Sequence, residues 1–403
     1  MKATGIVVEY NPFHNGHLLH AAESRRSTGN DVVIAVMSGP FLQRGEPALA
    51  SKWSRTRMAL ASGVDIVIEL PFPYAVQHAT HFAAGSVQLL NSIGCSSLCF
   101  GSEDGSVKPF VDTVKWRRDN QEVLDHQIQY YSKRGLSYPS AVAQSYEDLT
   151  SGQLNRLDLS KPNNMLGLQY MEAIEQYAPA IRPYTIKRQS SDYHDPLLHE
   201  NKISSATSIR KTISESSLAA IQDHVPAPSY KELSAYYEQT GQFHSWTHYW
   251  PVLQHLILTK SPQELGNYYE MEEGIQYRLV EAAKSCQSFN SFMEAVKTKR
   301  YTWTRIQRIL THLLNGSKKE EIFTHLTPSY LRLLGMNEKG RNYLQQHKKQ
   351  FSLPLISRIG KENEQLLRLD IRAGLVYAMG LQNRKARQQL MDSDFKQPPI
   401  IFG

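Results

Sequence analysis

The sequence predicts a doubly wound α/β domain with a parallel sheet, followed by a mainly helical C-terminal domain. Short β-branched apolar runs alternate with amphipathic stretches through the first hundred residues, which is the pattern of βα units. Strand character returns at residues 182–188 and is followed by a hydroxyl-rich helix start. After residue 225 the patterns are mostly helical.

Strands and helices alternate in a fixed order at the start of the chain. Each apolar run is too short for a helix and is followed by a longer amphipathic stretch, so every strand is expected to pair in parallel with its neighbours. We expect strands at 5–9, 32–37, 65–70 and 97–100, and helices at 16–27, 51–61 and 79–90.

The later segments complete this domain and begin the next. Residues 107–152 are polar and helix-like, which predicts an inserted helical segment. The prolines at 226 and 228 resist continuation of a helix or strand, so we place the domain boundary there. The predicted domains are therefore 1–225 and 226–403, and in the second of them 304–314 carries apolar residues at helical spacing.

Composition and charge limit the kind of protein. With 41% hydrophobic and 21% charged residues the chain is expected to be globular. The net charge of +7 is compatible with a polyanionic partner and does not prove one. The apolar runs fall far short of the roughly 20 residues that cross a bilayer, and the first is too short for a signal peptide. We therefore expect a cytoplasmic protein without membrane contact.

The three cysteines, Cys95, Cys99 and Cys286, fit a reducing compartment. Two of them are close in sequence, but no second ligand pair lies nearby at metal-binding spacing. We assign them no chemistry and predict no metal held by protein ligands alone.

The strongest local signal is a strand that runs through a proline-containing turn into a helix at His14-Asn15-Gly16-His17. A helix N-terminus presents free N–H groups and a partial positive charge, both suited to phosphate. Gly16 permits close approach, and His14 and His17 can face one side of the first turn. Two other interpretations are open: ordinary capping or surface histidines, or a metal site formed with His20.

Other loops follow the predicted strands at the same edge of the sheet. Residues 38–48 form a loop whose Arg44 either faces an anionic group or is solvated. Gly101 can let a nucleoside lie against the backbone, whereas spacing alone assigns no role to Asn163 or Arg188. The helix start at Ser205 to Arg210 is either a second phosphate site or a plain N-cap.

These motifs resemble the Rossmann-like nucleotidyltransferase superfamily with its HxGH element, and more narrowly the bacterial tRNA(Met) cytidine acetate ligases. The resemblance extends over the whole chain. It rests on NPFHNGH, SGPFLQRGEPA, DIVIELP, FGSE, KPNN, SATSIR, KRYTWTRIQRIL and LLGMNEKGR, in that order.

The resemblance implies an ATP-dependent ligase. Acetate and ATP give acetyl-adenylate and pyrophosphate, with Mg²⁺ expected beside the phosphates, and the acetyl group then passes to N4 of the wobble cytidine of elongator tRNA(Met). It implies that His14, His17 and Arg210 face the reacting phosphates. The ATP-binding residues that it implies are Val7, Val8, Glu9, Tyr10, Asn11, Pro12, Phe13, His14, Asn15, Gly16, His17, Leu18, Leu19, His20, Gly101, Asn163, Arg188 and Ser205.

For tRNA contacts, charge and motif position single out Arg300, Arg305, Arg308, Lys339 and Arg341. The alternative for each of them is an ordinary solvated charge on the surface. The alternative function is an adenylyltransferase acting on a small molecule. An aminoacyl-tRNA synthetase relative is disfavoured because no KMSKS-like loop is present, and a noncatalytic RNA-binding protein is disfavoured by the intact histidine pair. The sequence leaves the oligomeric state open.

Overall fold

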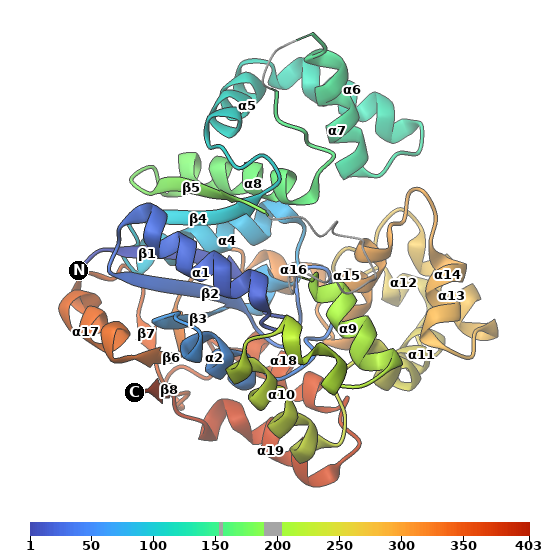
Figure 1. The fold of residues 1–403 in the computed structure, drawn as a ribbon. Helices are drawn as coiled ribbons and strands as arrows, with labels where there is room; N and C mark the ends of the chain where they lie inside the picture. The colour runs from blue at the N-terminus through green and yellow to red at the C-terminus, as the bar shows by residue number, and fades with distance from the viewer. Residues whose placement is uncertain (153–155, 189–203) are drawn as a thin grey trace.

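The computed structural model describes residues 1–152, 156–188 and 204–403, which form an eight-stranded sheet flanked by helices (Figure 1). The strand order is β5-β4-β1-β2-β3-β6-β7, with β8 beside β6. Strands β1 to β5 pair in parallel, and β6 runs antiparallel to β3. The strands are β1 Ala3–Val8, β2 Val32–Ser38, β3 Ile66–Leu70, β4 Ser97–Ser102, β5 Arg182–Lys187, β6 Leu331–Asn337, β7 Leu355–Ile356 and β8 Ile400–Phe402.

Helices cover both faces of the sheet. Helices α1 and α2 pack on one face, and α4 and α8 pack together on the other. The helices of this part are α1 Asn15–Thr28, α2 Lys52–Ala61, α3 Phe72–Ala75, α4 Ala79–Ser92, α5 Lys108–Asp119, α6 Gln121–Lys133, α7 Tyr138–Leu149, α8 Pro162–Tyr177, α9 Ala206–Glu215 and the 3₁₀ helix η1 Ala219–His224.

The second half of the chain is mainly helical, and α11 to α15 extend to one side of the sheet in Figure 1. In the described ranges, no helix combines the length and the apolar character that a membrane span requires. The helices are α10 Ala227–Thr240, α11 Trp250–Leu258, α12 Pro262–Leu265, α13 Ile275–Ser285, α14 Phe289–Val296, α15 Trp303–Leu314, α16 Lys319–Phe323, α17 Glu338–His347, α18 Arg368–Ala378 and α19 Arg384–Lys396, with 3₁₀ helices η2 Trp246–His248 and η3 Lys348–Gln350.

The alternation of side chains along β2 explains why the sheet needs two helical layers. Ile34 and Val36 belong to the core shared with α4 and α8, whereas Val33 and Ala35 belong to the core shared with α1 and α2. All four are fully buried. A parallel strand with apolar side chains on both faces is stable only between two covering layers, as the sequence predicted.

The predicted strands and helices of the first hundred residues are confirmed, with ends that differ by one or two residues. The insert predicted at 107–152 is the helical group α5 to α7, which lies beyond β5 and α8 in Figure 1. Strands β6, β7 and β8 were not predicted. They bring the end of the chain back to the first sheet, while the division into 1–225 and 226–403 stays a prediction.

Helix α15 is buried on more than one face. Ile306, Ile309 and Leu310 enter a separate core with α11, α13 and α14, as their helical spacing predicted. His312 lies on another face and is also fully buried, and its Nε2 finds a partner in the Val76 carbonyl oxygen after α3, 3.0 Å away. The helix therefore joins the helical core to the loops of the sheet.

A buried ion cluster fixes the C-terminal helices to the sheet. The Lys52 ammonium on α2 lies 2.8 Å from both Glu69 carboxylate oxygens on β3 and 2.6 Å from Asp394 on α19. All three side chains are buried. Asp370 on α18 accepts the Phe72 N–H at 2.7 Å and the hydroxyl proton of Tyr330. Burial raises the pKa of both Glu69 and Asp370, and the Lys52 charge opposes this shift at both carboxyl groups.

We expect Lys52→Met to lower the free energy of unfolding by about 3 kcal/mol or more, because it leaves two carboxylates buried without their cation. Urea unfolding followed by circular dichroism measures this change. Lys284→Met, which breaks an exposed pair with Glu281, is the matched control and should cost less than about 1 kcal/mol. Equal losses in the two variants would contradict the role given to Lys52.

Candidate functional site

The residues predicted to bind the nucleotide gather at the carboxyl ends of β1, β4 and β5. Strand β1 lies between β2 and β4, so the chain crosses to opposite sides of the sheet from this point. Ligands of doubly wound sheets bind at such a crevice. The turn after β1 leads into α1, Gly101 lies near the end of β4, and the Arg188 N–H donates to the Ser102 carbonyl oxygen at 2.9 Å. The topology thus brings these segments to one edge.

His14 and His17 form a reciprocal cap at the start of α1. The Nδ1 atom of His14 accepts the Gly16 N–H at 3.1 Å, and the Nδ1 atom of His17 accepts the His14 N–H at 3.2 Å. The two rings stack with their centroids 3.7 Å apart. Since each Nδ1 is an acceptor, each neutral ring carries its proton on Nε2. The capping interpretation is therefore correct for Nδ1, and it leaves an Nε2–H donor on each ring.

Both histidines are held neutral. Burial lowers the pKa of His14 to about 3, with further contributions from the charges of Arg188 and Arg210. Burial also lowers the pKa of His17 well below its ordinary value, and that of His20 to about 4. The positive charge of the site is thus carried by arginines, and the imidazoles serve as neutral hydrogen-bond donors.

The turn between β1 and α1 is strained and firmly held. Tyr10 has φ of 54°, a left-handed conformation that costs about 1 kcal/mol or more for such a residue. Its buried ring packs against Phe13 and His17, with centroids 4.5 and 5.0 Å away. The Asn11 side chain accepts the Leu49 N–H at 2.7 Å. Strain of this kind persists where the surroundings fix it, and it is frequent at functional sites.

Arg55 is the support that sequence reasoning missed. Its guanidinium is fully buried and donates to the Glu9 carbonyl oxygen at 2.7 Å and the Ser38 carbonyl oxygen at 2.9 Å. A third donor reaches the Ala50 carbonyl oxygen at 3.1 Å. The arginine lies in an amphipathic helix, where it reads as a surface charge, so no local signal identifies it.

Arg210 reaches the site from α9. One guanidinium nitrogen donates to the Asn11 carbonyl oxygen at 2.9 Å, and another lies 3.0 Å from the Glu46 carboxylate. The helix begins at a cap in which the Ser205 hydroxyl oxygen accepts the Ser208 N–H at 3.0 Å. The plain N-cap interpretation therefore describes Ser205, while Arg210 lies beside the histidine turn.

Glu103 joins two of the sequence motifs. Its carboxylate accepts the Asn163 N–H at 3.2 Å and the Asn164 N–H at 2.7 Å at the start of α8. In return, the Asn164 side-chain oxygen accepts the Glu103 and Asp104 N–H groups at 3.0 and 3.1 Å. A sequence signal for this contact exists, since a carboxylate suits the free N–H groups of a helix that begins with Pro-Asn-Asn.

The remaining predicted residues have varied surroundings. Val8 is a buried part of β1, and Leu18 on α1 is 39% exposed, so its side chain faces solvent. The Asn15 amide donates to the Asp223 carbonyl oxygen at 2.9 Å. A Cβ at Gly101 would lie 3.4 Å from the Arg188 side chain, so the two residues are close neighbours at the ends of β4 and β5.

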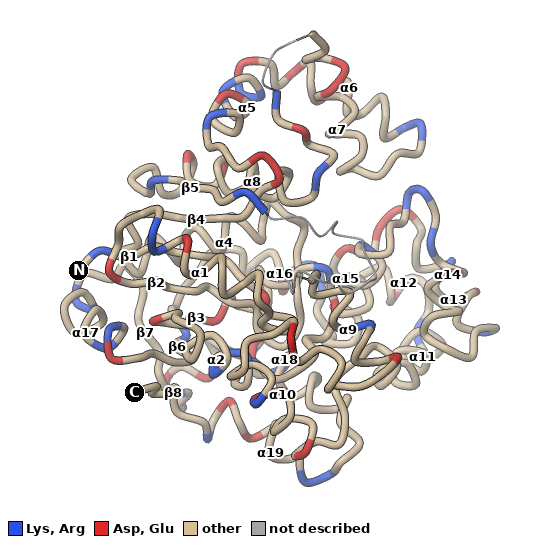
Figure 2. The backbone as a smooth tube through the Cα atoms, viewed as in Figure 1, with Lys and Arg blue, Asp and Glu red and all other residues tan. Residues whose placement is uncertain are grey.

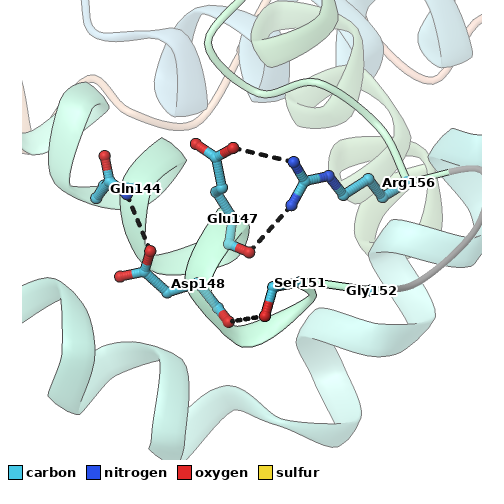
Figure 3. Close-up of a pocket in the computed structure, with 6 residues that line it drawn as sticks. All are labelled: Gln144, Glu147, Asp148, Ser151, Gly152 and Arg156. Carbon is cyan, nitrogen blue, oxygen red and sulfur yellow. Dashed lines mark hydrogen bonds and ion pairs between the residues drawn. The ribbon is translucent and has the colours of Figure 1, made fainter.

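A pocket drawn in Figure 3 lies away from this edge, on α7 and the turn after it. It has a volume of about 730 Å³, and Arg156 within it pairs with Glu147 at 2.9 Å. None of the predicted site residues lines it. Its lining residues are Gln144, Glu147, Asp148, Ser151, Gly152 and Arg156.

A metal site or a reactive thiol would be a second source of catalytic chemistry among the described residues. Within residues 1–152, 156–188 and 204–403, no cluster of three or more His, Cys, Asp and Glu side chains could hold a metal ion. Burial raises the pKa of Cys95, and it raises the pKa of Cys99 to about 11, so both thiols stay protonated.

Comparison with known proteins gives full-length matches. The family model of the HIGH nucleotidyl transferases matches residues 1–392. The tRNA(Met) cytidine acetate ligase of Lysinibacillus sphaericus (strain C3-41) is 47% identical over 402 residues, which cover 99% of this chain and 100% of that protein. The Bacillus subtilis (strain 168) protein of the same name is 47% identical over 387 residues, 95% of this chain and 93% of its own.

Two solved structures are also similar over the full length. Thermotoga maritima TmcAL in its apo form I has a TM-score of 0.92 and 31% identity, with 100% of both chains covered. The same protein bound with α-thio ATP has a TM-score of 0.90 and 30% identity, covering 100% of this chain and 99% of that one.

We expect His14 and His17 of the free protein to stay neutral, with the proton on Nε2, throughout pH 5 to 8. Long-range ¹H–¹⁵N NMR correlations, assigned with His14→Asn and His17→Asn, measure the tautomers. The histidines of the urea-unfolded protein, which titrate near about pH 6.5, are the reference. Because the folded pKa of His14 is depressed, the stability linked to its neutral form is complete above about pH 6.5 and is lost as the pH falls toward 3. A ring that titrates near 6.5 in the folded protein would contradict this expectation.

Proposed function

The chain belongs to the HIGH nucleotidyl transferase family and, within it, to the tRNA(Met) cytidine acetate ligases, and from this premise we propose how its site works. The enzyme is an ATP-dependent ligase that acetylates N4 of the wobble cytidine of elongator tRNA(Met). One observation supports this function above the others: two neutral Nε2–H donors at a helix N-terminus lie beside two arginines at the nucleotide crevice of the sheet. The full-length relatives favour this ligase over the small-molecule adenylyltransferase.

In the first half-reaction a carboxylate oxygen of acetate attacks the α-phosphorus of ATP. A new oxygen–phosphorus bond forms, the bond to the β-phosphate oxygen breaks, and pyrophosphate leaves. Acetate is a weak nucleophile, so the reaction depends on positioning and on stabilising charge at the phosphates. The His14 and His17 Nε2–H groups donate to phosphate oxygens, and Arg210 offsets their growing charge.

In the second half-reaction the cytidine N4 amine attacks the acetyl carbonyl carbon. The carbon–nitrogen bond forms, the bond to the adenylate oxygen breaks, AMP leaves, and N4 releases one proton to the solvent. The neutral histidines suit both steps, because a hydrogen-bond donor stabilises a phosphate oxyanion without giving up its proton.

ATP is proposed to lie along residues 7–20, with its phosphates at the start of α1 and its nucleoside toward Gly101. Asn163 and Ser205 are proposed to complete its surroundings, the first held by Glu103 and the second at the α9 cap. Arg188 is proposed to approach the nucleotide from the end of β5, where its charge already acts on His14 and His20.

We propose that Mg²⁺ accompanies ATP and shields the charge of the departing pyrophosphate. The carboxylates at this edge are already engaged, Glu9 by the Gln43 N–H at 2.8 Å and Glu46 by Arg210. Phosphate oxygens and water would therefore supply most of its ligands, as is usual for this ion.

The tRNA is proposed to approach from the side of the helical second half. Figure 2 shows basic residues around α13 to α15 with acidic residues among them. Arg308 pairs with Glu270 at 2.8 Å and is largely buried. Arg300 pairs with Glu273 at 2.9 Å but is exposed, so it is the better candidate for a phosphate contact. Lys339 and Arg341 lie on α17 after β6. Because β6 is antiparallel to β3, they are at the other end of the strands from the histidine turn. We also propose that the enzyme acts in the cytoplasm, because its proposed substrate is a tRNA.

We expect the purified protein to catalyse ATP–pyrophosphate exchange only when acetate is present. Addition of elongator tRNA(Met), followed by mass analysis of its nucleosides, should show one acetyl group gained on cytidine. Exchange without acetate, or none with acetate although ATP binds, would return the small-molecule adenylyltransferase to first place.

We expect His17→Asn to lower acetate-dependent exchange by more than about tenfold, because it removes the Nε2–H donor. The asparagine oxygen can still accept the His14 N–H, so the helix cap and the melting temperature should be retained. Exchange at the wild-type rate in a folded variant would remove His17 from the mechanism.

A further inference from the structure

The loop after β2 closes into a small hairpin, residues 41–47. Phe41 and Pro47 form an antiparallel bridge. Between them the Leu42 N–H donates to the Glu46 carbonyl oxygen at 2.9 Å, and the Gly45 N–H donates to the Leu42 carbonyl oxygen at 2.8 Å. The hydrogen bonds of the Glu46 carbonyl oxygen and of the preceding Gly45 N–H fix the place from which the Glu46 side chain extends.

Helix α15 fixes this hairpin from outside. Gly45 has φ of 85°, and a Cβ there would lie 2.4 Å from the Arg308 backbone nitrogen and the Gln307 carbonyl carbon. The Thr311 hydroxyl donates to the Gly45 carbonyl oxygen. Only glycine allows this approach, so the hairpin rests directly on the backbone of α15.

The side chain of Glu46 leaves this fixed hairpin and meets Arg210. The carboxylate and guanidinium are 3.0 Å apart, and the two side chains are 28% and 24% exposed. The second anchor of the guanidinium is the Asn11 carbonyl oxygen, in the turn that leads to His14. Arg210 is therefore held between the hairpin and the histidine turn, which lie on either side of it.

We propose that Glu46 is a positioning residue for adenylation, which holds the Arg210 guanidinium where it meets the phosphates of ATP. This inference rests on the proposed function. A free arginine side chain has many rotamers. Because two acceptors already hold the Arg210 guanidinium in the free protein, little further rotamer entropy is lost when the phosphates bind. Glu46 itself makes no bond to the reacting atoms, and its effect passes through Arg210.

A double-mutant cycle separates positioning from simple structural support. The four proteins are wild type, Glu46→Ala, Arg210→Ala and the double variant, each measured for kcat/KM of acetate-dependent exchange and for the ATP Kd by calorimetry. We expect Glu46→Ala to lower kcat/KM about tenfold in the wild type and to change it less than about twofold in the Arg210→Ala background. We expect Glu46→Gln, which keeps an acceptor oxygen, to recover part of the loss.

Glu232→Ala is the matched control, because Glu232 forms a similar half-buried pair with Arg57 and should leave exchange unchanged. Wild-type exchange with Glu46→Ala, or an equal loss in both backgrounds, would overturn the proposal. If the wild type shows no acetate-dependent exchange, the proposed function fails separately. The ATP Kd cycle then decides the inference: loss of affinity that depends on Arg210 supports it, and independent or absent effects refute it.

Discussion

The geometry of the site depends on one buried cation. Arg55 donates to carbonyl oxygens at the ends of both β1 and β2, which are adjacent parallel strands. A fully buried guanidinium is tolerated only when its donors are satisfied, and here the acceptors are backbone carbonyl oxygens, two of which lie where the strands end. The strained conformation at Tyr10 and the histidine cap come directly after the Glu9 carbonyl group that Arg55 binds, so the turn begins from a fixed position.

Sequence reasoning was most successful where local physics decides the structure. The continuous apolar run of β2 predicted a buried strand, and the helical period of α15 predicted a buried face. The glycine and histidines after β1 predicted the start of α1, and phosphate binding there stays a prediction. The edge of the sheet at which the motifs meet followed from the parallel order of the strands. These features are encoded within a few residues.

The remaining features depend on contacts between distant residues. β6 joins β3 although about 260 positions separate them, and its short apolar run has no local partner that marks it as a strand. Arg55 and Glu46 read as ordinary charges until the fold places a carbonyl or a guanidinium beside them. The same is true of Lys52, whose two carboxylate partners come from β3 and α19. Tertiary context determines the role of such residues.

The late position of β6 in the chain has a consequence for biosynthesis. Strand β3 is complete in sequence at Leu70, but its antiparallel partner begins only at Leu331. At roughly 5–20 residues per second, a ribosome needs from about ten seconds to about a minute to supply that partner. During this interval β3 is an edge strand of the nascent sheet. Its unpaired N–H and C=O groups on an apolar strand are the kind of surface that promotes aggregation. Chaperone occupancy should therefore be highest while α4 to α16 are being translated, and it should end as β6 emerges.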